Sequence, residues 1–296
     1  MESINCAVCN SSNFKILLKS RDYRYHLNKE EFTLVKCRKC GLIYLNPRPS
    51  EKEMDRFYPR EYYDLQFSLL EKKITQLFLK IGTAKLKKYK KKGLVLDLGC
   101  GAGDFLLEMK RFGFETIGID VSKRACDIAQ KKGIKVFNSE LKDCHFPDET
   151  FDVITLWHVF EHLHNPDQTL KEICRILKKD GILLIEVPNI ESFSFKLFKK
   201  YCFHLDIPRH LYHWSPKTLE KILLQNKIKI FEKDDFSLGF PLSLFHSFRN
   251  FLSDQKFNFL LLPIILVSSP FLFCLTFISR VLPARSEVLR IYARKY

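Results

Sequence analysis

The stretch that decides the fold is Leu94-Val95-Leu96-Asp97-Leu98-Gly99-Cys100-Gly101-Ala102-Gly103-Asp104. An apolar run is followed by three glycines spaced two residues apart, and a helical pattern begins after them. The stretch therefore predicts a strand, a tight turn and a helix. Glycine accepts the positive φ of such a turn and lets a ligand lie against the main chain. Since the N–H groups of the next helix point at the same place, we expect a ligand at Gly99, Gly101 and Gly103.

Seven apolar runs predict strands, and helical patterns separate most of them. The expected strands cover residues 94–98, 116–120, 135–137, 151–156, 182–187, 227–236 and 288–294. The clearest expected helices cover residues 122–132 and 166–177. This alternation predicts a doubly wound, mostly parallel α/β sheet that is covered on both faces. Ligands of such sheets bind beyond the carboxyl ends of the strands, where the glycine turn lies.

The acidic residues around the turn indicate which ligand it binds. Asp120 ends the next strand about 20 residues later, where a nucleoside-binding fold needs a carboxylate for the ribose hydroxyls. NAD and adenosyl compounds share that need. The dinucleotide fingerprint, however, is G-x-G-x-x-G, whereas the three glycines here are evenly spaced and lie between Asp97 and Asp104. Two acids would repel a pyrophosphate, but they suit the ammonium and sulfonium groups of S-adenosylmethionine.

Four of the ten cysteines form two Cys-x-x-Cys pairs, Cys6 with Cys9 and Cys37 with Cys40. This spacing is typical of a zinc ribbon, in which four thiolates close a tetrahedral, structural Zn²⁺ site. A redox pair is the alternative. Short strands expected at 14–18 and 31–35 offer little core, so metal binding would supply much of the folding free energy. No secretory signal pattern opens the sequence, which predicts a reducing, cytoplasmic location.

A capping box follows the second cysteine pair. Ser50 and Glu53 have the spacing that starts a short helix. An aromatic cluster comes next, and it either packs between modules or forms a lid over a substrate. Its members are Phe57, Tyr58, Tyr62 and Tyr63.

Four motifs together resemble a class I S-adenosylmethionine-dependent methyltransferase between residues of about 90 and 235. They are the turn DLGCGAG, the strand ending in Asp120, the approach FPDETFD at 146–152, and HVFEHL at 158–163. With the cysteine pairs and NPRP at 46–49 in front, and RHLYHWSP at 209–216 behind, the chain is similar to one subfamily. That subfamily includes bacterial sugar C-methyltransferases and ubiquinone-pathway-type O-methyltransferases. The resemblance implies a Rossmann-like, seven-stranded sheet whose last two strands pair antiparallel.

The same resemblance implies how the cofactor is held. Asp97, Gly99, Gly101 and Gly103 would surround its methionine part, and Asp120 would bind the ribose. Glu140 and Leu141 would lie near the adenine, although the family usually has aspartate at the first of these positions. Trp157 and His158 would close the pocket.

Methyl transfer needs an aligned nucleophile and, for many acceptors, a base that removes its proton. Six of the nine histidines fall in the two loops expected past the strand ends, and neutral histidine suits this role near pH 7. They are His158, His162, His164, His204, His210 and His213. We expect His162 first and His210 second as the base. The alternative is that Glu161 and His162 fix the loop while solvent deprotonates an acidic enol or phenol.

Two segments point to a membrane. An expected helix at 66–92 has an apolar face and a lysine-rich end, which is either a solvated charge run or a site for an anionic membrane or nucleic acid. Residues 257–279 carry no charge. The apolar stretch reaches the roughly 20 residues of a membrane span, but one span would separate the last strand from its sheet. We therefore expect a broken hairpin or an in-plane segment, with a hydrophobic dimer interface as the alternative. The net charge of +15 agrees with an anionic surface.

These expectations divide the chain into a zinc ribbon (1–50), a linker with a basic helix (51–92), a methyltransferase core (93–236), a hydrophobic insertion (237–286) and a last strand (287–296). We expect an enzyme at the cytoplasmic face of a membrane, peripheral or monotopic, acting on a small amphipathic or lipid-linked substrate such as a quinone precursor or glycan intermediate. The alternatives are an RNA methyltransferase, disfavoured because no Asn/Asp-Pro-Pro-aromatic motif follows the fourth strand, and a cofactor-binding scaffold without catalysis. The oligomeric state stays open.

Overall fold

The structure is a computed structural model that describes residues 1–27, 29–59, 80–234, 240–255 and 286–296. Three sequence expectations lie outside these residues: the aromatic pair Tyr62 and Tyr63, residues 66–79 of the basic helix, and the apolar stretch 257–279. The end of the basic helix is described, and its residues 80–89 are helical.

The main sheet has seven strands in the order β10-β11-β8-β7-β4-β5-β6. Their bounds are β4 (Leu94–Leu98), β5 (Glu115–Asp120), β6 (Lys135–Asn138), β7 (Phe151–Trp157), β8 (Leu177–Pro188), β10 (Ile228–Asp234) and β11 (Val288–Lys295). The pairs β4–β5, β4–β7, β5–β6 and β7–β8 are parallel. Strand β11 runs antiparallel to both β8 and β10. The predicted doubly wound, seven-stranded sheet with an antiparallel last pair is confirmed.

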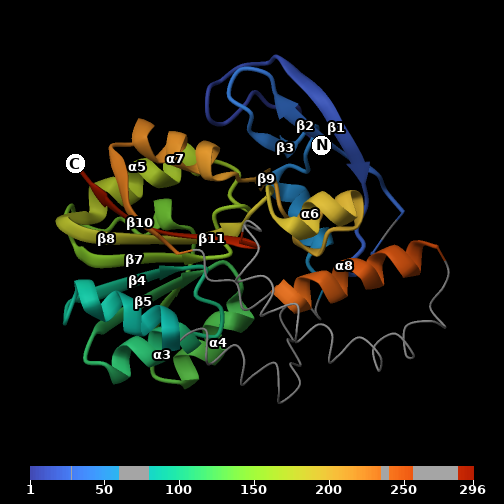
Figure 1. Cartoon of the computed structure of the whole chain (residues 1–296). Helices are drawn as coiled ribbons and strands as arrows, with labels where there is room; N and C mark the ends of the chain where they lie inside the picture. The colour runs from blue at the N-terminus through green and yellow to red at the C-terminus, as the bar shows by residue number, and fades with distance from the viewer. Residues whose placement is uncertain (28, 60–79, 235–239, 256–285) are drawn as a thin grey trace.

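Helices cover both faces of this sheet, as Figure 1 shows, with α3 and α4 on one face and α5 and α7 on the other. The α-helices are α3 (Asp104–Arg111), α4 (Lys123–Lys131), α5 (Pro166–Ile176), α6 (Phe193–Phe198), α7 (Pro216–Gln225) and α8 (Phe240–Asp254). Short 3₁₀ helices are η1 (Glu51–Phe57), η2 (Leu141–Asp143), η3 (Lys199–Tyr201) and η4 (Phe203–Leu205). Neighbouring strand residues face opposite cores, since Val95 packs on the α3 side and Leu96 on the α5 side.

The expected starts of two helices are confirmed by their N-terminal caps, whereas the expected start of one strand is wrong. The Ser122 hydroxyl accepts a hydrogen bond from Ala125 N (3.3 Å) where α4 begins. The Glu53 carboxylate accepts from Ser50 N (2.9 Å), as the capping box requires. Strand β8, however, begins at Leu177 rather than 182, because buried Leu177 pairs with Phe151 across a bulge. The charged residues Lys178, Lys179 and Asp180 interrupt the apolar pattern, so a hydrophobicity pattern does not show this extension.

A second sheet lies beside the main one in the order β1-β2-β3-β9. Its strands are β1 (Phe14–Ser20), β2 (Phe32–Cys37), β3 (Ile43–Leu45) and β9 (Tyr212–His213). The first two were expected with slightly different ends. Strand β9 comes from far along the chain and pairs with β3, Tyr44 opposite Tyr212. The N-terminal sheet therefore includes a strand from the segment that carries His210, one of the two expected bases.

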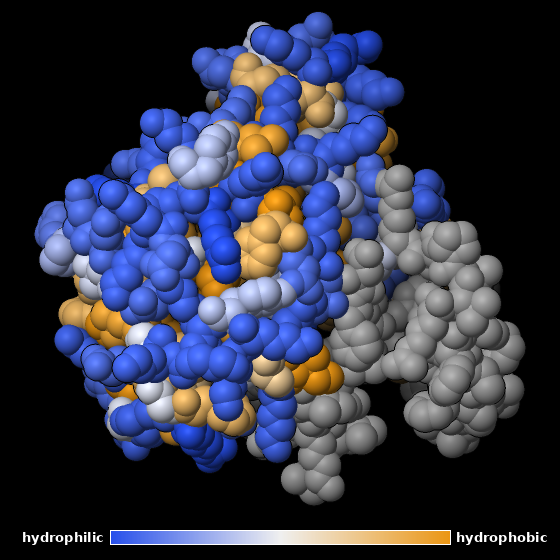
Figure 2. Space-filling model, turned by 60° about the vertical axis from the view of Figure 1, so that its left-hand side comes forward, coloured by the Kyte–Doolittle hydropathy of each residue, from blue (hydrophilic) through white to orange (hydrophobic). Residues whose placement is uncertain are grey.

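None of the described helices has the length and apolar character that crossing a membrane requires. Helix α8 packs along α6, where the Ser243 hydroxyl donates to Glu287 Oε2 (2.9 Å) and lies 3.2 Å from Ser194 Oγ. Figure 2 shows a face on which hydrophobic residues of the described chain stand in small groups among hydrophilic ones.

Candidate active site

The glycine turn joins β4 to α3 with positive φ at all three glycines, 66° at Gly99, 52° at Gly101 and 75° at Gly103. A Cβ at Gly99 would lie 2.3 Å from Val159 Cγ2, so packing against the loop after β7 requires glycine there. A Cβ at Gly101 would meet no atom of the described residues within 4 Å. The main chain at Gly101 is therefore open to a ligand, as the sequence predicted.

A cavity of about 1570 Å³ opens at the carboxyl ends of β4, β5 and β7. Its volume exceeds the roughly 300–1,000 Å³ of common small-molecule pockets, which leaves room for a nucleoside cofactor and a second reactant. Eight of the residues expected from the sequence line it. They are Gly99, Gly101, Asp120, Glu140, Leu141, Trp157, His158 and His162. Four others lie behind the lining and not in it: Asp97, Gly103, Glu161 and His210.

Asp120 stands at the end of β5 with its carboxylate fixed by two backbone donors. Gly101 N lies 2.8 Å from Oδ2, and Ser122 N lies 2.8 Å from Oδ1. Burial raises the pKa of Asp120, while the two N–H groups oppose that shift. The carboxylate thus links the glycine turn to β5 and still offers acceptor lone pairs to a ribose.

Asp97 lies under the cavity floor, 2% exposed, where it accepts a hydrogen bond from Thr155 Oγ1 (2.6 Å). Burial raises its pKa to about 8, the Thr155 hydrogen bond lowers it, and the nearby Asp120 carboxylate raises it further. Gly103 also lies behind the turn, where it begins α3 and packs against Ala129. The sequence could not separate residues that touch the cavity from residues that support it.

Asp97→Asn is expected to stabilise the cofactor-free protein, and more so as the pH rises. The folded-state pKa lies above the ordinary value of about 4, so stability is present at low pH and is lost as pH rises toward 8. Asparagine avoids this loss, which amounts to a few kcal/mol at pH 8. Thermal unfolding of both proteins at pH 5 and pH 8 measures it, and an advantage of asparagine that does not grow with pH would contradict the assignment.

Trp157 and His158 form one wall. The Trp157 ring lies between Phe105 (centroids 5.2 Å apart) and the Arg290 guanidinium (5.2 Å). His158 has a φ of 54°, and its Nδ1 and Nε2 lie 3.4 and 3.2 Å from carboxylate oxygens of Glu161 and Glu186. Burial alone would lower the pKa of His158, but the two carboxylates raise it to about 10. His158 is therefore a cation at neutral pH and a poor base.

His162 lines the cavity with one ring nitrogen fixed. Nδ1 lies 3.0 Å from the Arg209 carbonyl oxygen and 3.0 Å from the Tyr58 hydroxyl. A carbonyl only accepts, so Nδ1 carries the hydrogen and the neutral ring has its lone pair on Nε2. Burial lowers the pKa of His162, although nearby Glu161 and Asp206 oppose the shift. The ring is thus neutral at pH 7, with Nε2 able to take a proton.

Glu161 and His210 lie behind His162. Glu161 is 1% exposed, and its Oε1 lies 3.4 Å from His158 Nδ1 and 3.9 Å from His210 Nε2. The ring of His210 packs edge-on against that of His162 (centroids 4.6 Å), and its Nδ1 donates to the His204 carbonyl (2.9 Å). Burial and then the neighbouring His162 hold the pKa of His210 well below its usual range. Because His210 does not line the cavity, the expectation that it is a second base is not supported.

The same three side chains offer metal-ligand atoms, since one atom each of Glu161, His162 and His210 lies within 4.8 Å of the others. Carboxylate and imidazole suit ions such as Zn²⁺ and Fe²⁺.

Comparison with known proteins decides the family. The model of a family described as a methyltransferase domain matches residues 65–228, more than half of the chain. The chain belongs to this methyltransferase domain family. The catalytic domain is therefore an S-adenosylmethionine-dependent methyltransferase domain of class I, as the glycine turn predicted.

The relatives of this methyltransferase include enzymes named for quinones. The ubiquinone biosynthesis O-methyltransferase of Pelagibacter ubique is 32% identical over 49% of this chain and 61% of its own length. The demethylmenaquinone methyltransferase of Lactobacillus johnsonii is 28% identical over 65% of this chain and 88% of its own. The chain spans little more than half the length of the first curated relatives it matches. A solved S-adenosylmethionine-dependent methyltransferase from Mesorhizobium loti, 14% identical, shares the fold with a TM-score of 0.51 over 73% of this chain and 96% of that one.

Two features of the methyltransferase site were missed from the sequence. Tyr58 was expected only as a member of an aromatic cluster, and the structure places it in the cavity lining beside His162. Phe57 of the same cluster is buried and packs against Phe32 (centroids 5.7 Å apart), as the packing alternative expected. Arg209 was quoted within a motif but given no role. Its carbonyl orients His162, and no local pattern could have shown this because the two residues are far apart in sequence.

The four paired cysteines come together at one end of the methyltransferase, beside β2. Cys6 Sγ lies 3.3 Å from Cys40 Sγ, Cys9 Sγ lies 3.5 Å from Cys37 Sγ, and all four sulfurs lie within 4.8 Å of one another. Zn–S bonds of about 2.3 Å place the sulfurs of a tetrahedral site about 3.8 Å apart. The donor set and the spacing therefore fit one Zn²⁺ ion.

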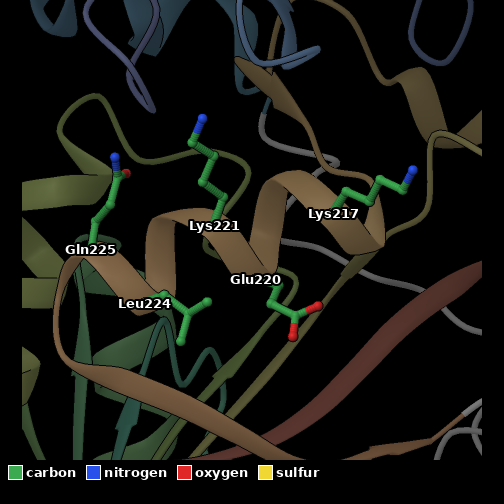
Figure 3. Close-up of a pocket in the computed structure, with 5 residues that line it drawn as sticks. All are labelled: Lys217, Glu220, Lys221, Leu224 and Gln225. Carbon is green, nitrogen blue, oxygen red and sulfur yellow. The ribbon is translucent and has the colours of Figure 1, made fainter.

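A second hollow, of about 460 Å³, runs along α7. Figure 3 shows its lining as side chains of that single helix: Lys217, Glu220, Lys221, Leu224 and Gln225. No residue of the glycine turn or of the histidine loops lines this hollow. We therefore place the methyltransferase site in the larger cavity alone.

Proposed function

We propose that this protein transfers the methyl group of S-adenosylmethionine to an oxygen or carbon of a small amphipathic or lipid-linked acceptor, such as a quinone precursor or a glycan intermediate. The observation that carries the proposal is that His162, with its lone pair on Nε2, lines the same cavity as Gly101 and Asp120. One cavity thus combines a cofactor cradle with a base. The names of the quinone-related relatives support the acceptor class.

The residues have distinct proposed roles toward the cofactor. The open main chain at Gly99 and Gly101 receives its methionine part, and Asp120 accepts from its ribose hydroxyls. Glu140 and Leu141 border the adenine. The raised pKa of Asp97 shows that its ionised form is poorly solvated, so a cationic ammonium nearby would stabilise it.

When bound, the cofactor supplies an activated methyl group on a sulfonium that leaves as a neutral sulfide. The protein then has to align the acceptor with this methyl group and remove the proton of the acceptor. His162 Nε2 takes that proton while Nδ1–H stays on the Arg209 carbonyl. Tyr58 and the cationic His158 border the acceptor, where His158 would stabilise negative charge on an enolate or phenolate.

We also propose two further features. The cysteine cluster holds a structural Zn²⁺ ion and makes residues 1–50 a zinc ribbon. The chain acts at the cytoplasmic face of a membrane, an inference from the net charge of +15 and from the uncharged residues 257–279. Binding to anionic vesicles in a flotation assay tests the latter, and a wild type that does not float would refute it. Equal flotation of a variant that lacks residues 256–285 would refute the part given to the uncharged stretch.

The acceptor is tested by incubating the full chain with methyl-tritiated S-adenosylmethionine and an organic extract of cell membranes. We expect label in the organic phase with the wild type and almost none with His162→Asn. Label in RNA added as a competitor would instead identify an RNA methyltransferase. Cofactor binding without transfer to any fraction would identify a scaffold and overturn the proposal.

A further inference from the structure

Arg209 is a fully buried cation at the centre of three chain segments. Its Nη2 lies 2.7 Å from Asp22 Oδ1 and 2.7 Å from Asp206 Oδ1. Its Nη1 donates to the carbonyl oxygen of Phe57 (2.9 Å) and contacts Asp22 Oδ2 (3.3 Å). The guanidinium fork therefore joins the N-terminal sheet, the end of η1 and the loop before β9.

Asp22 is the contact from the N-terminal sheet. It is 1% exposed and lies in the loop between β1 and β2. Its Oδ1 also accepts from Arg24 N (3.1 Å) and Tyr25 N (3.1 Å), which orders that loop. The Arg209 guanidinium packs over the Tyr25 ring at 4.8 Å. The N–H groups of its own loop therefore fix the Asp22 carboxylate in the position from which it accepts from Arg209.

Both groups that touch His162 Nδ1 depend on this arginine. The first is the carbonyl of Arg209 itself, 3.0 Å away. The second is the hydroxyl of Tyr58, also 3.0 Å away, and Tyr58 directly follows Phe57, whose carbonyl the guanidinium holds. One buried side chain therefore fixes both neighbours of the ring nitrogen that decides the tautomer.

We propose that Arg209, held by Asp22 of the N-terminal sheet, is a positioning residue that keeps His162 in the Nδ1–H tautomer with Nε2 toward the cavity. The N-terminal sheet then has a second role besides carrying the cysteine cluster, because it orients the base. The kinetic consequence rests on the proposed function, whereas the tautomer itself does not.

The fork explains why arginine is needed. A guanidinium can donate to Asp22, Asp206 and the Phe57 carbonyl at once, whereas the single ammonium of lysine cannot span these acceptors. Asp22→Asn keeps an acceptor for the loop N–H groups but turns an amide N–H₂ or a neutral oxygen toward the guanidinium. Neither substitution changes His162 or Tyr58. Each weakens only the contacts of residue 209 that fix the positions of these two side chains.

The titratable and charged groups around His162 come from three segments: the end of η1, the loop after β7 and the loop before β9. They are Tyr58, His158, Glu161, Asp206, Arg209 and His210. A loosened loop would admit water to the ring, and the acidic limb of any rate profile that depends on His162 would then move to higher pH. A change that only lowers global stability would leave that limb where it is.

The test is ¹⁵N spectroscopy of the full chain labelled at histidine, with His162→Asn used to assign the His162 signals. We compare the wild type with Arg209→Lys and Asp22→Asn. Asp152→Asn serves as the matched control, because Asp152 also accepts from a backbone N–H and a cation (Leu94 N 2.9 Å, Lys178 Nζ 2.8 Å) but lies away from the cavity. We expect a single Nδ1–H tautomer in the wild type and the control, and a mixture of tautomers in the other two.

A pure Nδ1–H tautomer of His162 in folded Asp22→Asn would overturn the proposal, and this variant keeps the test decisive if Arg209→Lys fails to fold. A wild-type ring in the Nε2–H tautomer would also overturn it. In the labelled transfer assay, Arg209→Lys should lower kcat about 10- to 100-fold with the cofactor Kd changed less than about twofold. A mixed tautomer with unchanged kcat would uphold the positioning role and refute His162 as the base.

Discussion

His162→Asn is expected to lower kcat by a factor of about 10² to 10⁴, the range that positioned general bases contribute. The asparagine amide N–H₂ can take the place of Nδ1–H and donate to the Arg209 carbonyl, so the loop keeps its contact. What is lost is the lone pair that Nε2 presents to the cavity. Cofactor affinity should change less than about twofold, since the glycine turn and Asp120 are untouched.

The pH dependence of the rate provides a second test of the role of His162. Burial lowers the pKa of His162, so the unprotonated base persists below pH 6.5 and the rate falls only at lower pH, as the ring gains its proton. His145→Asn is the control, because His145 is exposed, lies outside the cavity and has a φ of 47° that asparagine tolerates. Equal kcat for the wild type and His162→Asn would leave solvent as the proton acceptor and refute the role of this residue.

Cys37→Ser is expected to remove bound zinc and to destabilise the protein by several kcal/mol. Metal binding supplies much of the folding free energy of small cysteine-bound modules. The buried residues Leu34, Val35 and Tyr44, which share the main core, hold the rest of this sheet. Elemental analysis should find about one zinc per wild-type chain and much less in the variant. Cys174→Ser, a cysteine on α5 outside the cluster, is the control and should keep its zinc.

The structure adds a consequence for activity. Because β9 pairs with β3 and Asp22 holds Arg209, loss of the metal should also disturb the loop that orients His162. We expect kcat to fall together with the zinc content when the wild type is treated with a chelator, and to recover when zinc is added back. Zinc-free protein with unchanged melting temperature would contradict the assignment of a structural metal.

Much of the fold was predictable because its strands and turns are determined by residues that are close together in the sequence. The runs at 94–98, 151–156 and 182–187 are nearly all apolar, as strands of a parallel sheet covered on both faces must be. The turn at Gly99 and Gly101 is equally local, and it fixed the cofactor class. The cysteine cluster was predictable for the same reason, since the two cysteines of each Cys-x-x-Cys motif are only three positions apart in the sequence.

The missed features depend on contacts between distant residues. Asp22 and Arg209 are 187 positions apart, and β9 is a strand of two residues that no periodicity can reveal. The sequence also could not rank His162 above His210 on geometry, since both are histidines in loops. Only the fold shows that one lines the cavity and the other lies behind it.

The cavity at the glycine turn is expected to hold S-adenosylmethionine, and calorimetric titration of the full chain with this cofactor is the most direct test. The wild type should bind one equivalent. Gly101→Ala, whose added methyl group projects into the open space at the turn and whose φ of 52° costs about 1 kcal/mol, should bind at least about tenfold more weakly. No binding by the wild type, or equal affinity of a folded Gly101→Ala variant, would contradict the claim.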